Sequence, residues 1–375
     1  MSTSICKEMV PGLRVARLVR THLEEWVVTA APIGRDDLSR LIGDARRVAR
    51  EAGATIVAED IFGISSTEPA AVAAVQVDGE RPDWPVTWLV PGPHADSRLA
   101  GVQVHAVKGV AVERIEKEGR VVGSVFDDGF ARHCRLGDLR PLDASAPPDQ
   151  QASATFELTE AALGAAGMDF SNVVRTWFYL DRIHAWYGSF NRVRNEFFRE
   201  RKVFDGLVPA STGIGGANAA RAGLIANAHA IRPRDGGVKI RAVPSPLQCT
   251  ALAYGSSFSR AIEVEMPDHR RLWISGTASI AADGKTAHAG DLAAQIDLTM
   301  KVVAAILESR GLNWRDATRV VVYMQDERGA GRFQDYCAGH GLDCLPVVIS
   351  ENDICREELL FEIEVDAGRQ LSRGH

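Results

Sequence analysis

The sequence is poor in cysteine and has no strongly basic segment. Its six cysteines among 375 residues include no C-x-x-C pair, so they are too sparse for a disulfide scaffold and lack the spacing of a zinc site. The formal net charge of −6, with no block of Lys and Arg, argues against a general nucleic-acid binder. We therefore predict reduced thiols, no metal and no nucleic-acid partner.

Long hydrophobic runs are also missing. No stretch approaches the roughly 18 apolar residues of a membrane span, and the opening residues, MSTSICK, contain no apolar signal region. We therefore expect a cytoplasmic protein without a membrane partner. With 46% hydrophobic and 25% charged residues, the composition is typical of a globular chain. The length allows two or three packed domains.

Three segments repeat a strand-like layout with two polar residues on one face. Residues two apart in a strand point to the same side, so each segment presents one polar pair: Gln103 with His105, Asn227 with His229, and Glu362 with Glu364. Only the last pair is acidic. A proline precedes each segment at a similar distance: Pro85 lies 18 residues before Gln103, Pro209 lies 18 before Asn227, and Pro346 lies 16 before Glu362. The pattern predicts three copies of one unit.

The second and third copies share a further stretch. Three residues recur with a displacement of 144: Gly167 as Gly311, Arg175 as Arg319, and Tyr179 as Tyr323. This period exceeds the roughly 20–50 residues of solenoid units, so we predict tandem domains at 20–108, 109–240 and 245–368. A linker from residue 232 and a non-repetitive insert up to about residue 266 are expected between the last two.

Apolar periodicity predicts an α+β fold in each unit, with helices on one face of a mixed sheet. In unit one we expect the first strand at 24–31, a helix from Leu38 to about Ala49, and at most a remnant of a second helix at 70–75. The open face of such a sheet needs a partner. Three units in one chain predict a pseudo-threefold arrangement within one polypeptide, and a homo-oligomer would also cover the open faces.

The third unit, from Ile274-Ser-Gly-Thr-Ala through Glu362-Ile-Glu364, resembles the RidA (YjgF) family of reactive-intermediate deaminases. The resemblance implies a chorismate-mutase-like fold that assembles as trimers with active sites between subunits. Members of the family hold a substrate carboxylate with an arginine two residues after the strand proline. Thr87, Ser211 and Val348 occupy that position here, which counts against enamine or imine deamination.

A closer resemblance, over residues 175–364, is to the chorismatases, long-chain relatives of the same fold that cleave the enolpyruvyl ether of chorismate. Four stretches carry it: Arg175-Thr-Trp; Phe190-Asn191 with Arg194; Pro209-Ala-Ser-Thr212-Gly-Ile-Gly215; and Asp353-Ile-x-Arg356-Glu-x-Leu-Leu-x-Glu362-Ile-Glu364. The resemblance implies that Glu362 protonates the enolpyruvyl methylene. The other candidates are predicted to bind substrate: Arg175, Tyr179, Arg194, Thr212, Gly213, Gly215, Arg319, Tyr323 and Glu364.

These candidates also have plainer interpretations. Glu362 and Glu364 could form a solvated strand face, whereas a catalytic Glu362 needs a pKa raised by burial or by a neighbouring charge. Arg175 and Arg194 could each give two parallel donors to a carboxylate. Arg319 is better explained as a surface arginine on an edge, and the two tyrosines could simply pack.

The glycine-rich stretch Gly213-Ile-Gly215-Gly216 does not predict a dinucleotide site. A Rossmann fingerprint needs a helix after the loop, but only about seven residues separate Gly216 from the next expected strand. The glycines could let backbone N–H groups approach a ligand or could make a tight turn. No cofactor is predicted.

The sequence therefore favours a chorismatase-like enzyme that takes a small carboxylate substrate, releases pyruvate and leaves a cyclic acid. Two alternatives stay open. The first is a RidA-type deaminase of enamines or imines. The second is a non-catalytic protein that binds a small carboxylate.

Overall fold

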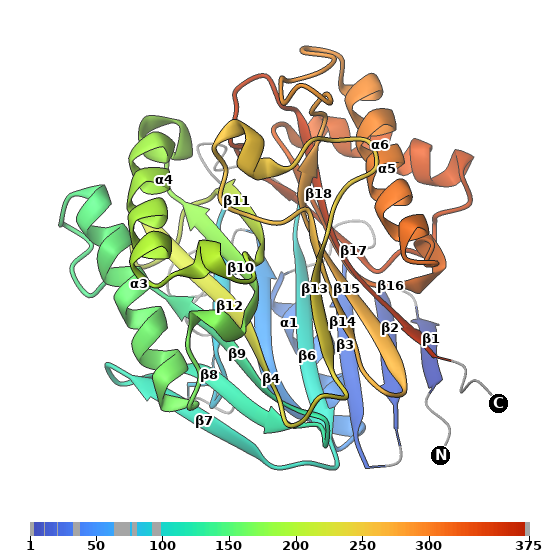
Figure 1. Cartoon of the computed structure of the whole chain (residues 1–375). Helices are drawn as coiled ribbons and strands as arrows, with labels where there is room; N and C mark the ends of the chain where they lie inside the picture. The colour runs from blue at the N-terminus through green and yellow to red at the C-terminus, as the bar shows by residue number, and fades with distance from the viewer. Residues whose placement is uncertain are drawn as a thin grey trace.

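The computed structural model describes residues 4–10, 12–20, 22–32, 38–63, 76, 81–91 and 99–371. The strands of these residues form three six-stranded sheets, one for each repeat, with the helices on their outer sides (Figure 1). Among the same residues, no helix has both the length and the apolar character needed to cross a bilayer.

Sheet one contains, in spatial order, β1 (Ser4–Val10), β2 (Leu13–Val19), β3 (Glu24–Ala30), β6 (Gly101–Lys108), β4 (Thr55–Phe62) and β5 (Val86–Leu89). Helix α1 (Leu38–Glu51) covers it with buried residues at the predicted helical spacing, and Gly53 follows with a φ of +66°. The strand predicted at 24–31 is confirmed as β3, but it is not the first strand of the unit, because β1 and β2 form a hairpin ahead of it. The expected helical remnant at 70–75 lies outside the described residues.

Sheet two contains β7 (Val112–Lys117), β8 (Arg120–Asp127), β9 (Ala131–Leu139), β12 (Leu224–Pro233), β10 (Val173–Leu180) and β11 (Ala210–Gly215). Helices α3 (Pro148–Ala165) and α4 (Ile183–Glu200) cover its outer face. Phe190 and Phe197 of α4 stack on Phe156 of α3, so the apolar face of α4 packs into the core. Strands β7 and β8 form a hairpin, and every residue of β10 is buried.

Sheet three contains β13 (Lys239–Val243), β14 (Ala261–Glu265), β15 (His269–Ala278), β18 (Phe361–Gln370), β16 (Ala317–Met324) and β17 (Val347–Glu351). Helices α5 (Leu292–Ser309) and α6 (Ala330–Gly339) lie outside it. The prediction of a non-repetitive insert up to residue 266 is wrong, because β13 and β14 pair there. They occupy the same place in sheet three as β1 and β2 in sheet one. The strands of both missed hairpins are short and carry charged residues, which obscures the alternation of apolar and polar residues that would mark them as strands.

The three sheets share one topology. When the six strands of a sheet are numbered in sequence order, their order in space is 1, 2, 3, 6, 4 and 5 in every sheet. The fourth and fifth strands pair in parallel. We propose that each sheet with its helices is one unit, close to the predicted bounds 20–108, 109–240 and 245–368. By this topology the first unit gains two strands before residue 20, and the third gains β13 before residue 245.

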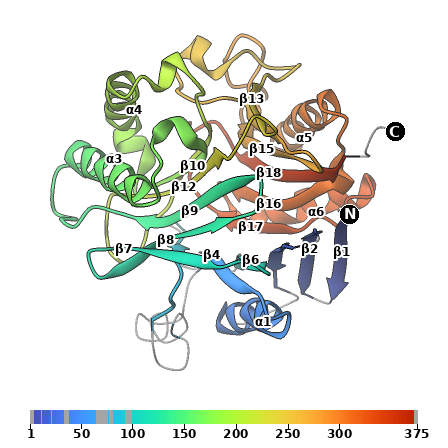
Figure 2. The same cartoon turned by 60° about the horizontal axis from the view of Figure 1, so that its bottom comes forward.

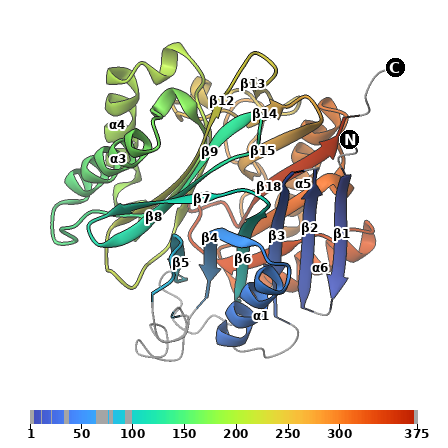
Figure 3. The same cartoon turned by 90° about the horizontal axis from the view of Figure 1, so that it is seen from below.

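The units close in a ring. The strand at the end of each sheet in space, which is the fifth in sequence, lies beside the third strand of the next sheet. These neighbours are β5 with β9, β11 with β15, and β17 with β3. In Figures 2 and 3 the helices therefore lie at the periphery and the sheets face one another inside. A central apolar cluster joins all three, with Phe62 from sheet one, Tyr179 from sheet two and Tyr323 from sheet three. The predicted pseudo-threefold arrangement within one chain is confirmed.

Strand pairing corrects the alignment of the repeats. Gln103 pairs with Asp60 and Asn227 with Trp177, at the same distance after a bulge as Glu364 with Val321. The position that matches Gln103 and Asn227 is therefore Glu364, which lies 18 residues after Pro346. Glu362 instead matches two residues that carry no ionisable group, Gly101 and Ile225.

Candidate active site

Glu364 is the centre of a fully buried polar network between units two and three. Its carboxylate accepts hydrogen bonds from Arg319 Nη1 at 2.6 Å, Arg175 Nη2 at 2.8 Å, Thr212 Oγ1 at 2.5 Å and Trp177 Nε1 at 3.0 Å. Burial raises the pKa of Glu364, but the charges of Arg319 and Arg175 outweigh it and hold that pKa below its ordinary value. The Glu364 carboxylate is therefore ionised and paired with two guanidinium groups.

Three of the predicted substrate anchors thus bind a side chain of the protein itself. Arg175, Arg319 and Thr212 are all buried and all contact Glu364. The expectation that Arg319 lies at a surface edge is wrong, because its side chain is 0% exposed. The network joins β10 and β11 of one sheet to β16 and β18 of another. The geometry of this network is suited to holding these four strands in position.

The two repeated tyrosines lie in the central apolar cluster. Tyr179 and Tyr323 are buried, and the ring of Tyr323 meets Phe62 edge-on with centroids 6.5 Å apart. Gly215 lies at a close approach of two backbones, since its N–H donates to Asp353 O at 2.8 Å and a Cβ there would come within 2.7 Å of the Asp353 Cβ. The contacts of the two tyrosines and of Gly215 are therefore packing contacts within the protein.

A cavity lies at the junction of units two and three, next to this network. Its walls come from α4, β11, β15, the segment before β14 and the segment leading into β18; they comprise Tyr187, Arg194, Ser211, Gly213, Ser256, Phe258, Arg260, Gly276, Ala278, Ile280, Cys355, Arg356, Leu359 and Glu362. Of the predicted site residues, Glu362, Arg194 and Gly213 meet here. The interpretation of the acidic pair as a solvated face is wrong, because Glu362 is 5% exposed and Glu364 is 0% exposed.

Glu362 reaches this cavity because Gly276, on the neighbouring strand, has no side chain. A Cβ on Gly276 would lie 2.0 Å from Glu362 Oε1, closer than any real contact. The Gly276 N–H donates to Thr212 Oγ1 at 3.0 Å, which ties this backbone to the Glu364 network. Glycine is therefore needed at 276 for the carboxyl group of Glu362 to occupy its place.

Glu362 is a protonated acid at neutral pH. Burial raises its pKa, the ionised Glu364 raises it further, and the opposing charges of Arg175 and Arg260 are weaker, so the pKa is about 8. Glu362 and Glu364 are two residues apart on one strand, yet one is neutral and the other charged. Paired carboxyl groups with pKa values pushed apart in this way are typical of a site where one group supplies a proton.

Three arginines line the same cavity. Arg194 is 2% exposed and donates from Nη2 to Asn191 Oδ1 at 2.8 Å, one turn earlier in α4. Arg260 donates from Nη2 to Cys249 O at 2.9 Å, and Arg356 donates from Nη1 to Gly284 O at 3.0 Å. The cavity therefore combines one neutral acid with three cations, which favours an anionic ligand with more than one negative group.

Sequence reasoning missed Arg260 and Arg356 as site residues. Arg356 stands in one of the stretches that resemble chorismatases, so the signal for it was present. Arg260 directly precedes β14 (Ala261–Glu265), inside the segment expected to be a non-repetitive insert. Among the described residues, no group of three His, Cys, Asp or Glu side chains is arranged to hold a metal ion.

Comparison with known proteins finds two similar chorismatases. One, from Streptomyces hygroscopicus, is 28% identical over 269 residues, which cover 65% of this chain and 76% of the relative. The other, from Streptomyces rapamycinicus, is 28% identical over 222 residues, which cover 52% of this chain and 64% of the relative, just under two thirds. The chain matches no protein-family model.

The fold is also that of a solved chorismatase. The crystal structure of a chorismatase superposes on 92% of this chain and 98% of its own, with a TM-score of 0.63 and 20% sequence identity. In sequence the chain is therefore similar to two chorismatases, and it shares the fold of a solved chorismatase.

Proposed function

We propose that this protein is an enzyme that acts on chorismate and removes its enolpyruvyl group as pyruvate. The observation that carries the proposal is the neutral carboxyl group of Glu362, facing a cavity that three arginines line. Chorismate carries two carboxylates and one enol ether, so it needs cationic anchors together with a single acid. The similarity to proteins named chorismatase supports the choice of substrate.

The chemistry follows from the polarity of an enol ether. Glu362 donates its proton to the terminal methylene carbon, which becomes a methyl group, and the positive charge that develops is shared by the ether carbon and oxygen. Water then bonds to the ether carbon and loses one proton. The resulting hemiketal breaks its bond to the ring oxygen while the proton of its hydroxyl group passes to that oxygen, which gives pyruvate and a ring alcohol. The ionised Glu362 recovers its proton from the water that reacted.

The ring product follows from which bond breaks. Hydrolysis leaves a dihydroxycyclohexadiene acid, whereas elimination of the whole side chain from the ring leaves a hydroxybenzoate. We propose that Arg194, Arg260 and Arg356 bind the two carboxylates of the substrate. Arg175, Arg319 and Thr212 then act as positioning residues, because they hold Glu364 ionised next to Glu362.

Incubation of the purified protein with chorismate, with pyruvate followed by coupled reduction to lactate, tests the proposal. We expect pyruvate from the wild type and from a Glu357→Gln control, whose substituted residue is exposed, and none from Glu362→Gln. A wild type that consumes no chorismate would overturn the proposal. Release of ammonia from imine substrates would favour a deaminase, and chorismate binding without turnover would favour a binding protein.

A further inference from the structure

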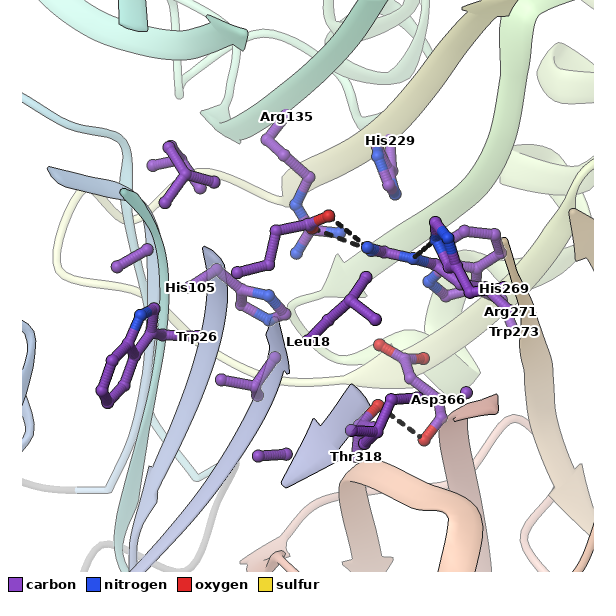
Figure 4. Close-up of a pocket in the computed structure, with 18 of the residues that line it drawn as sticks. Leu18, Trp26, His105, Arg135, His229, His269, Arg271, Trp273, Thr318 and Asp366 are labelled. Atoms are coloured by element: carbon purple, nitrogen blue, oxygen red, sulfur yellow. Dashed lines mark hydrogen bonds and ion pairs between the residues drawn. The ribbon is translucent and has the colours of Figure 1, made fainter. Parts of the chain in front are cut away.

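A second cavity lies where the three sheets meet, away from the Glu362 cavity. It has a volume of about 80 Å³, several times the roughly 10–15 Å³ that one water molecule needs on the same measure. His105, His229 and Asp366 line it from β6, β12 and β18 (Figure 4). These three residues pair with Ala58, Arg175 and Arg319, the corresponding residues of the neighbouring strands. The cavity therefore lies on the pseudo-threefold axis, and we call it the axial cavity.

Arg135 supplies the main charge of the axial cavity. It lies on β9 and is 7% exposed, and in Figure 4 its side chain points into the space between His105, His229 and Arg271. Its guanidinium lies over the Trp177 ring at 5.4 Å, but within the described part of the chain it makes no hydrogen bond or ion pair. Arginine is seldom buried without a partner, so this group is available to a ligand.

The nearby carboxylates are engaged elsewhere. Glu25 pairs with Arg271, which donates from Nη1 to Glu25 Oε2 at 2.9 Å and from Nη2 to Oε1. Asp366 lies 3.9 Å from Arg319 Nη1, and Asp60 lies 3.7 Å from Arg319 Nη2. Burial lowers the pKa of Arg135 below its ordinary value, and these three acids offset that effect only in part. None of them forms an ion pair with it.

Further polar atoms around the axial cavity have no hydrogen-bond partner among the described residues. They are His229 Nδ1, His105 Nε2 and Asp366 Oδ1. Burial and the nearby charge of Arg135 hold the pKa of both histidines well below the ordinary value, so the two rings are neutral. A neutral imidazole can donate one hydrogen bond, and it can therefore complete a set of donors around an anion held by Arg135.

Much of the remaining wall is apolar, although His269, Thr318 and the Glu25–Arg271 pair also line the axial cavity. Leu18, Trp26, Val57, Val107, Phe126 and Trp273 line it. A fully hydrated inorganic anion gains nothing from such a surface, whereas a short carbon chain loses water-exposed apolar area there. The volume limits the chain to a few atoms. A planar carboxylate also matches the two parallel N–H donors of a guanidinium.

We propose that the axial cavity binds a carboxylate of two or three carbons, with its charged end on Arg135 and its alkyl end against Leu18 and Trp273. The site is separate from the Glu362 cavity and does not depend on the proposed function. Arg135 has no equivalent in the other two units, because strand pairing places Val27 of unit one and Trp273 of unit three at the matching positions. One such ligand is bound per chain.

Thermal unfolding with increasing sodium acetate tests this site, at constant ionic strength set with sodium chloride. We expect the Tm of the wild type to rise by a few degrees and to saturate. Arg135→Gln should abolish the rise. Arg132→Gln, the same change on the same strand but outside the cavity, should keep it. Arg194→Gln should keep it as well, which separates this site from the Glu362 cavity.

Acetate saturation-transfer NMR on the wild type and on Leu18→Phe gives a second measurement that does not need Arg135→Gln to fold. The larger side chain should fill the axial cavity and remove the acetate signal. The absence of saturable acetate binding to the wild type would overturn the proposal. So would acetate binding that survives Arg135→Gln, that is lost in Arg194→Gln, or that chloride or phosphate reproduces equally.

Discussion

Replacing Glu362 by Gln should make the protein more stable, by an amount that grows with pH. In the folded state the pKa of Glu362 is about 8, against an ordinary value of 4.5, so the folded protein binds a proton more tightly than the unfolded chain. Between pH 4.5 and about pH 8 the free energy of unfolding of the wild type therefore falls as pH rises. A glutamine has no proton to lose, so the variant escapes this cost.

The size of the effect follows from the shift. One pKa unit corresponds to about 1.36 kcal/mol, so the variant should gain about 1 kcal/mol over the wild type at pH 5, about 3 kcal/mol at pH 7 and about 5 kcal/mol at pH 9. These figures are the pH-dependent part of the difference. The other buried acids, including Asp60 and Asp366, are present in both proteins and cancel.

Urea unfolding followed by tryptophan fluorescence at the three pH values measures this difference, with the slope of the transition checked for constancy. Glu357→Gln is the matched control, because an exposed substitution should stay within about 0.5 kcal/mol. If the curves for Glu362→Gln and the wild type stay parallel from pH 5 to pH 9, Glu362 is not a protonated acid, and the reasoning fails.

Three further predictions concern the same cavity and its support. The value of kcat/KM for chorismate should fall above about pH 8, as Glu362 ionises; a flat profile to pH 9.5 would contradict its role as the acid. Gly276→Ala should lower kcat at least about 100-fold with little change in circular dichroism, because its Cβ would occupy the place of Glu362 Oε1; normal turnover would show that the carboxyl group need not lie there. Glu364→Gln should cost about 3–5 kcal/mol in urea unfolding, since two buried guanidinium groups lose their partner, whereas Glu113→Gln at a surface ion pair should cost about 1 kcal/mol or less.

Much of the fold could be predicted from local patterns. The apolar runs of β10 and β16 and the repeated Gly, Arg and Tyr spacing indicated tandem units, and the need to cover three open sheet faces indicated the ring. The opening hairpins were missed because β1 and β13 lie at sheet edges, where one side is exposed and charged residues are tolerated. Their alternation is therefore weak in the sequence.

The candidate site was predicted in part. Glu362 and Arg194 stand in stretches that resemble chorismatases, and both line the cavity. The roles of Arg175 and Arg319 could not be read from the sequence, because a buried arginine and a ligand-binding arginine look alike until their partner is known. That partner, Glu364, lies 45 residues from Arg319 and 189 from Arg175. Only the folded chain brings the three together.

The most direct test of the account is the fate of one hydrogen atom. When the reaction is run in D2O and the pyruvate is trapped at once by reduction to lactate, the wild type should give lactate with one deuterium in its methyl group, because Glu362 transfers a solvent-derived proton to the enolpyruvyl methylene. Glu362→Gln should give no pyruvate above the uncatalysed rate. Pyruvate without methyl deuterium, or singly deuterated pyruvate formed at the wild-type rate by Glu362→Gln, would contradict the account.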